Sequence, residues 1–98
     1  VALSTTVGAR AEFTFTGTSV RWVGQRRRDS GIARVYLDGV LVGEVDTFAP
    51  LQDEYLAAVF SRTDLAPGTH VLAIEVTGLK HPGSTGTQVI IDAFDVAP

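Results

Sequence analysis

The sequence predicts an all-β domain, specifically an antiparallel β-sandwich, on three observations. Seven segments have the length and composition of strands, and the clearest of them, such as Arg10–Thr16, alternate apolar and polar residues with the two-residue period of a strand. Turn-forming residues separate these segments at intervals of roughly 8–12 residues, which is the spacing typical of a sandwich or barrel. No ten-residue window carries the periodicity of an amphipathic helix.

The clearest local structure is a β-hairpin over Gly31–Val45. Its first half alternates two sets of side chains, with Ala33, Val35 and Leu37 on one expected face and Ile32, Arg34 and Tyr36 on the other. Asp38-Gly39 follows, and this dipeptide supplies the positive φ angles that a two-residue hairpin turn requires. A second apolar, β-branched run then returns antiparallel to the first.

Two strands are expected before the hairpin and three after it. They are Arg10–Thr16, Ser19–Gly24, Tyr55–Ser61, Val71–Thr77 and Gln88–Val96. The weakly patterned residues 1–9 form either a linker end or a first edge strand, and residues 62–70 form a turn or one short helical turn. We expect the chain to cross between the two sheets at the wider gaps that precede Tyr55 and Gln88.

Composition bounds the class of protein. Ninety-eight residues make one domain, and the absence of cysteine excludes a disulfide framework and a Cys-ligated metal. The formal net charge of −3 argues against nucleic acid or an anionic membrane as the main partner. No apolar run approaches the ~20 residues of a membrane span. The chain begins at Val1 rather than Met, so we expect a part of a larger protein.

The order of motifs carries a resemblance to a known family. The chain reads FTFTGTSVRWVG, then a charged loop, then GIARVYLDGVLVGEVDTF, a Tyr-led strand, LAPGTHVLAIEVTG and finally VIIDAFDV. This order resembles the galactose-binding-like jelly-roll modules of secreted bacterial glycoside hydrolases and polysaccharide lyases, over Phe13–Val96. The resemblance implies a non-catalytic module that binds a polysaccharide or oligosaccharide and tethers a secreted catalytic domain. Such modules usually have one or two more strands at the start, so in a single module over residues 1–98 either the N-terminal strand is missing or it comes from a neighbouring segment or chain.

Catalysis by this chain is not expected. It has no cysteine nucleophile, and the spacing of His70 and His81 suggests no Ser-His-Asp arrangement. Asp53 and Glu54 are adjacent, and adjacent side chains on an extended chain point apart, so they do not flank one glycosidic bond.

The densest charge cluster is Arg26-Arg27-Arg28-Asp29. It is either a solvated turn or a set of hydrogen-bond donors for sugar hydroxyls or a uronate, since arginine binds carboxylates in bidentate geometry. Three cations on one tip suit an acidic glycan better than a neutral one. Lys80 and His81, in the loop-like segment Gly78–Thr87, are further candidates for sugar contact.

Aromatic residues are the other candidates for sugar contact. Trp22 shares a strand face with Val20, which favours core packing over stacking on a sugar. Tyr36 is expected beside Arg34 on an open sheet face, and Phe48 and Tyr55 flank the connection over residues 46–54. For these three aromatic residues, packing and sugar contact both remain open.

A structural calcium ion is a further possibility, because calcium prefers several hard oxygen ligands. No cofactor other than this Ca²⁺ is expected, and no sequence motif marks the site. The candidate ligands are Asp46, Asp53, Glu54 and Asp92. For Asp92, a structural hydrogen bond to a loop amide is the first expectation.

The sequence thus favours sugar binding in the loops Gln25–Ser30, Asp46–Tyr55 and Gly78–Thr87 over binding on the sheet face with Arg34 and Tyr36. The alternative is a structural or interaction module that packs against a partner domain and has no sugar site. An exposed edge or a broad apolar patch would favour that alternative.

Overall fold

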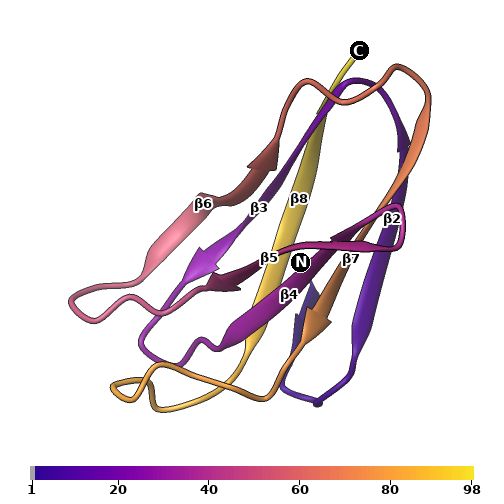
Figure 1. The fold of residues 1–98 in the computed structure, drawn as a ribbon. Coiled ribbons are helices and arrows are strands. Elements are labelled where there is room, and N and C mark those ends of the chain that lie inside the picture. Colours follow the sequence, from indigo (N-terminus) through magenta and orange to yellow (C-terminus); the bar gives the residue numbers. More distant parts are fainter. Residues whose placement is uncertain (1) are drawn as a thin grey trace.

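The computed structural model describes residues 2–98 and consists of two four-stranded antiparallel sheets packed face to face (Figure 1). The strands are β1 (Ala2–Ser4), β2 (Arg10–Thr16), β3 (Ser19–Arg26), β4 (Ile32–Leu37), β5 (Val40–Asp46), β6 (Glu54–Arg62), β7 (Thr69–Val76) and β8 (Val89–Ala97). One sheet has the order β1-β8-β3-β6 and the other the order β2-β7-β4-β5. This is the eight-stranded jelly roll, so the predicted fold class is confirmed.

The hairpin is confirmed in detail. Leu37 pairs with Val40, which leaves a two-residue turn. Asp38 and Gly39 have φ angles of 51° and 82°, as a type I′ turn requires. Ala33 and Val35 are fully buried, so the other set of side chains lies on the outer face of the sheet.

The connections depart from the expectation. The two predicted crossings between sheets occur, at β5–β6 and β7–β8, but every other connection except the β4–β5 hairpin also crosses. Facing sheets lie only ~10 Å apart, so an arch as short as Gly17-Thr18 suffices to change sheets. The segment before β2 contains the edge strand β1, while Val1 lies outside the described residues. Whether a further N-terminal strand is missing stays a prediction.

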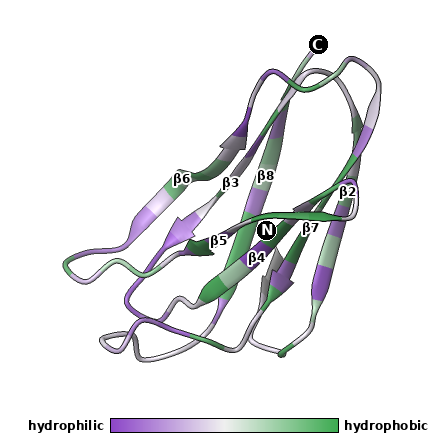
Figure 2. Ribbon diagram, in the orientation of Figure 1, coloured by the Kyte–Doolittle hydropathy of each residue, from purple (hydrophilic) through white to green (hydrophobic). Residues whose placement is uncertain are grey.

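The core lies between the sheets and is built from alternating residues of the long strands, visible as alternating colours along the ribbons in Figure 2. Trp22, Val20, Val35, Leu72 and Ile74 are essentially inaccessible to solvent. The Trp22 indole N–H donates to the backbone oxygen of Ile90 at 3.2 Å, which satisfies its one polar group. The core position favoured for Trp22 is therefore confirmed.

β6 is irregular in its pairing with β3, although residues 56–59 keep the expected alternation of exposed and buried side chains. The strand pairs with β3 through two register shifts, so extra β6 residues are inserted into the ladder. Each inserted residue reverses which side chains face inward. Val59 is buried, whereas Leu56, with a φ of 51°, is 73% exposed.

The two ends of the sandwich are built differently (Figure 1). The end that carries the β3–β4 loop (27–31), the β5–β6 loop (47–53) and the β7–β8 loop (77–88) is called the loop end below. The opposite end carries the two-residue β2–β3 and β4–β5 connections and the six-residue β6–β7 connection, and is called the turn end. No helix among residues 2–98 has the length and apolar character needed to cross a membrane.

Candidate functional site

A hollow of about 330 Å³ opens at the loop end. The β3–β4, β5–β6 and β7–β8 loops all contribute to its lining, which consists of Arg27, Arg28, Asp29, Asp53 and Thr85. The three loops are far apart in the sequence, and the fold brings them together because they connect strands that end on the same side of the sandwich.

Backbone hydrogen bonds join the three loops into one unit. The amide of Arg27 donates to Thr47 at 3.0 Å, and the amide of Ala49 donates back to Arg27 at 3.0 Å. On the other side, the amide of Thr85 donates to Arg28 at 2.9 Å. Because each loop is paired to the central β3–β4 loop, the hollow is formed before any ligand arrives.

Ser84 anchors this arrangement from inside. Its hydroxyl is buried, with the residue 4% exposed, and lies 3.1, 2.7 and 2.8 Å from the backbone oxygens of Arg28, Ser30 and Gly86. The single hydroxyl proton is shared among three acceptors, so Ser84 links the β3–β4 loop to the β7–β8 loop. Sequence reasoning missed Ser84, because a serine in a Gly/Ser/Thr-rich loop carries no signal that it is buried.

Arg27 is neutralised inside the hollow. Its Nε lies 3.2 Å from Asp29 Oδ1 and 3.8 Å from Asp53 Oδ2, and its Nη1 donates to Gln25 at 3.3 Å. Asp53 also accepts from the Arg28 amide at 3.4 Å and from the Tyr55 hydroxyl at 3.3 Å. These contacts fix the positions of both carboxylates.

The three arginines predicted to act as one cationic tip do different things. Arg26 pairs with Glu54 at 3.3 Å and does not line the hollow. Arg27 is held between two carboxylates. Within residues 2–98, no side chain engages the guanidinium of Arg28, which is exposed and lines the hollow. Only one of the three is therefore available as a free donor.

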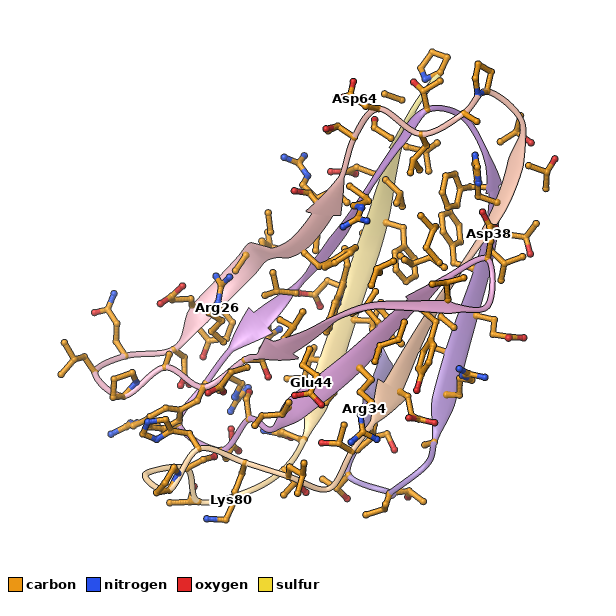
Figure 3. All side chains as sticks on the ribbon, in the orientation of Figure 1. Arg26, Arg34, Asp38, Glu44, Asp64 and Lys80 are labelled. Atoms are coloured by element: carbon orange, nitrogen blue, oxygen red, sulfur yellow. The ribbon has the colours of Figure 1, made fainter. Side chains whose placement is uncertain are left out.

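Phe48 and His81 form an aromatic pair at the same end. Their rings stack with centroids 4.5 Å apart and planes 13° from parallel. The Gly83 amide donates to His81 Nδ1 at 3.0 Å, so the ring proton of the neutral imidazole is on Nε2. Neighbouring Lys80, labelled in Figure 3, donates to the Ser84 backbone oxygen at 2.8 Å. Tyr55 is 63% exposed beside this end.

The sheet-face candidates, Arg34 and Tyr36, lie on the outer face as predicted, but their polar groups are engaged. Arg34 pairs with Glu44 at 3.1 Å (Figure 3) and lies 3.8 Å from Glu75. The Tyr36 hydroxyl donates to Glu75 at 3.3 Å, and the Arg10 guanidinium covers the Tyr36 ring at 4.4 Å. These contacts engage the polar groups of both side chains with neighbouring residues of the same sheet.

The four candidate calcium ligands are not assembled. Asp46 accepts from the Phe48 amide at 3.0 Å, and Asp92 accepts from the side-chain amide of Gln25 at 3.5 Å rather than from a backbone amide. Glu54 and Asp53 are occupied by arginines. Within the part of the chain that the structure describes, no three metal-binding side chains gather. A calcium ion stays a prediction that no cluster of carboxylates supports.

A separate titratable pair lies at the turn end. His70 Nδ1 is 2.6 Å from Asp38 Oδ2, and His70 Nε2 is 2.6 Å from the Ala66 backbone oxygen. Two acceptors require two ring protons, so the hydrogen bond to Asp38 and then that to Ala66 raise the pKa of His70. The same hydrogen bond, together with the Val71 amide, lowers the pKa of Asp38.

Segments of larger known proteins are similar to this chain. No family model matches the chain. A segment of an A type blood N-acetyl-alpha-D-galactosamine deacetylase from Flavonifractor plautii is 46% identical over 69% of this chain. A segment of an A type blood alpha-D-galactosamine galactosaminidase from the same organism is 35% identical over 72%. The chain spans only 8% and 6% of the lengths of these two relatives.

Among solved structures, a Paenibacillus xanthan lyase matches over 97% of this chain and 10% of its own, with a TM-score of 0.62 and 21% identity. At that identity the likeness shows the fold alone. The matching segments are thus small parts of much larger carbohydrate-active enzymes.

Proposed function

We propose that this chain is a non-catalytic carbohydrate-binding module that tethers a larger, secreted polysaccharide-degrading enzyme to its substrate. The observation that carries the proposal is the loop-end hollow, which is preformed and lined by both donors and acceptors from three loops. Tethering would raise the effective concentration of polysaccharide at a linked catalytic domain without any chemistry in this module.

The lining matches what a sugar offers. Each sugar hydroxyl donates one hydrogen bond and accepts others, so it needs acceptors and donors close together. Asp29 and Asp53 supply acceptors, as does the Thr85 hydroxyl oxygen, whose proton is donated to the Arg28 backbone oxygen, while the Arg28 guanidinium supplies donors. Bonds to charged partners are stronger than neutral ones, and the Arg28 guanidinium has the planar fork that binds two oxygens at once.

The two curated relatives support a binding role. One is named as a deacetylase and the other as a galactosaminidase, yet each contains a segment similar to this chain. A segment shared by enzymes with different reactions is better suited to a task common to both, and holding a glycan is such a task.

The proposal is tested with the purified 98-residue chain on a glycan array, with and without EDTA. Removing the free donor by Arg28→Ala should weaken binding about tenfold or more, because a hydrogen bond to a charged group contributes roughly 1.5–3 kcal/mol. Arg26→Ala is the matched control, since Arg26 pairs with Glu54 outside the lining, and it should bind as the wild type does.

Absence of glycan binding by a folded sample, or equal losses in the Arg28 and Arg26 variants, would contradict the proposal. Loss of binding in EDTA would support the calcium prediction, and unchanged binding would remove it.

A specific observation favours a second candidate, an interaction module that packs against a neighbouring domain. Leu51, Tyr55 and Leu56 are 90%, 63% and 73% exposed and lie close together in the chain around the start of β6. A double Leu51→Ser, Leu56→Ser variant tests it. Under the second candidate this variant loses affinity for the linked domain, whereas under the first it keeps full glycan binding.

A further inference from the structure

We propose that the loop-end hollow selects uncharged sugars, and that Asp29 and Asp53 are the residues that exclude acidic ones. The inference rests on the proposed function and names its substrate class as a neutral hexose or N-acetylhexosamine rather than a uronic acid or a sulfated sugar. It reverses the expectation that the arginine-rich sequence raised.

The balance of charge among the side chains that line the hollow favours an uncharged ligand. Two arginines and two aspartates line the hollow, so their formal charges cancel. The charges are also unevenly placed, because Arg27 lies against both carboxylates and Arg28 against neither. The group of Arg27, Asp29 and Asp53 carries a net charge of −1, and among the lining residues the Arg28 guanidinium supplies the compensating charge.

The second argument is the hydrogen-bonding capacity that remains. Asp29 accepts one side-chain hydrogen bond, from Arg27, and a carboxylate has about four acceptor sites. Asp29 therefore keeps free acceptor positions at the edge of the hollow, where its side chain is 43% exposed. A hydroxyl of a neutral sugar can donate to Asp29 while a neighbouring hydroxyl accepts from Arg28.

A carboxylate or sulfate on the ligand can use only half of this arrangement. It accepts from Arg28 but donates nothing to Asp29 or Asp53, and its charge lies well within a Debye length of ~10 Å from both carboxylates. Asp53 and Arg27 have side chains only 24% and 32% exposed, so water screens this repulsion incompletely. Because the Arg28 amide and the Tyr55 hydroxyl both hold Asp53, it cannot swing away at low cost.

The experiment measures calorimetric affinities for three oligosaccharides that differ at one position, carrying a neutral N-acetyl or hydroxyl group, a carboxylate, or a free amine. The wild-type chain should bind the neutral form tightest and the acidic form at least about tenfold more weakly. Asp29→Asn and Asp53→Asn should each reduce that preference about tenfold or more, by gaining affinity for the acidic form.

Asp64→Asn is the control for charge. It makes the same change in net charge at the turn end (Figure 3), and its φ of 58° is one that asparagine tolerates. Its sugar preference should equal that of the wild type. Thermal melting of each variant confirms that it is folded, and the ranking on the wild-type chain itself requires no variant.

The outcomes separate the two proposals. If the wild-type chain binds none of the three sugars, the proposed function fails and this inference fails with it. Tighter wild-type binding to the acidic or the amine form overturns the inference alone. Equal shifts in Asp53→Asn and Asp64→Asn overturn it as well, since the effect would then come from net charge.

Discussion

The two ends of the sandwich use polar side chains in opposite ways. At the turn end, Asp38 engages both carboxylate oxygens, one with His70 and the other with the Val71 amide. His70 in turn engages both ring nitrogens. At the loop end, Arg28 leaves its whole guanidinium available and Asp29 uses one acceptor site.

The comparison separates polar groups that stabilise the fold from those that are free to bind a ligand. A fully engaged group such as Asp38 contributes to the free energy of folding but offers nothing to a sugar. The Arg28 guanidinium forms no hydrogen bond or ion pair with another side chain among the described residues, so its hydrogen-bonding capacity remains available to a ligand. We therefore expect stability and glycan binding to respond to different substitutions at the two ends.

Ser84→Ala should have the largest effect, and it should lower both the free energy of unfolding and the glycan affinity. It removes a buried hydroxyl on which backbone groups of two loops converge, so the free energy of unfolding should fall by about 1–3 kcal/mol. Because the same loops form the hollow, glycan affinity should fall too. Urea unfolding and calorimetry measure the two quantities, with exposed Ser61→Ala as the matched control. Full glycan affinity in Ser84→Ala would show that the loops do not need this anchor.

The His70–Asp38 pair should make stability depend on pH without affecting glycan binding. The pKa of His70 is raised, so its stabilisation is complete below its unfolded-state value of about 6.5 and is lost as the pH rises through the folded-state value. The pKa of Asp38 is lowered, so its stabilisation is present above about 3.9 and is lost on further acidification. Stability from this pair should therefore be greatest between these two limits.

Thermal melts across pH 3–9 measure this dependence, and His70→Ala should flatten the alkaline decline. Asp38 is the one charged side chain in contact with His70 among the described residues, and the Phe15 ring lies 5.6 Å from the His70 ring. A decline that persists unchanged in His70→Ala would assign the effect to another group.

Leu56→Gly should have the smallest effect and concerns backbone strain. At the turn end, positive φ angles fall on Asp38 and Asp64, a residue type that tolerates them, whereas beside the loop end one falls on Leu56. Glycine relieves roughly 1–2 kcal/mol of strain and costs about 0.5–1 kcal/mol of chain entropy, so a small gain in stability is expected. Leu41→Gly, also exposed but without a positive φ, should destabilise the chain instead. Equal losses in both variants would show that Leu56 is not strained.

Much of the fold could be predicted from local patterns. The Asp38-Gly39 turn and the alternation of Ala33 and Val35 depend on neighbours in sequence, and both are confirmed. The two bulges of β6 against β3 were not predicted, because register depends on the partner strand. The number of crossings was underestimated, since a short arch resembles a hairpin turn in sequence.

The loops that form the hollow could be predicted, but the pairing of their charges could not. The sequence indicated the three loops, and the structure brings them together around one hollow. It did not indicate that Asp53, 26 positions after Arg27, would neutralise that arginine, because ion pairing between loops depends on the tertiary fold. Ser84 was missed for the same reason.

An NMR titration of the ¹⁵N-labelled chain with the neutral oligosaccharide that it binds best tests most directly whether the loop-end hollow is the binding site. If the hollow is the site, we expect amide shift changes at Arg27, Arg28, Asp29, Asp53 and Thr85, and unchanged signals for Asp38 and His70. Shift changes confined to the turn end, or to the outer face around Arg34 and Tyr36, would contradict the assignment of the hollow as the binding site.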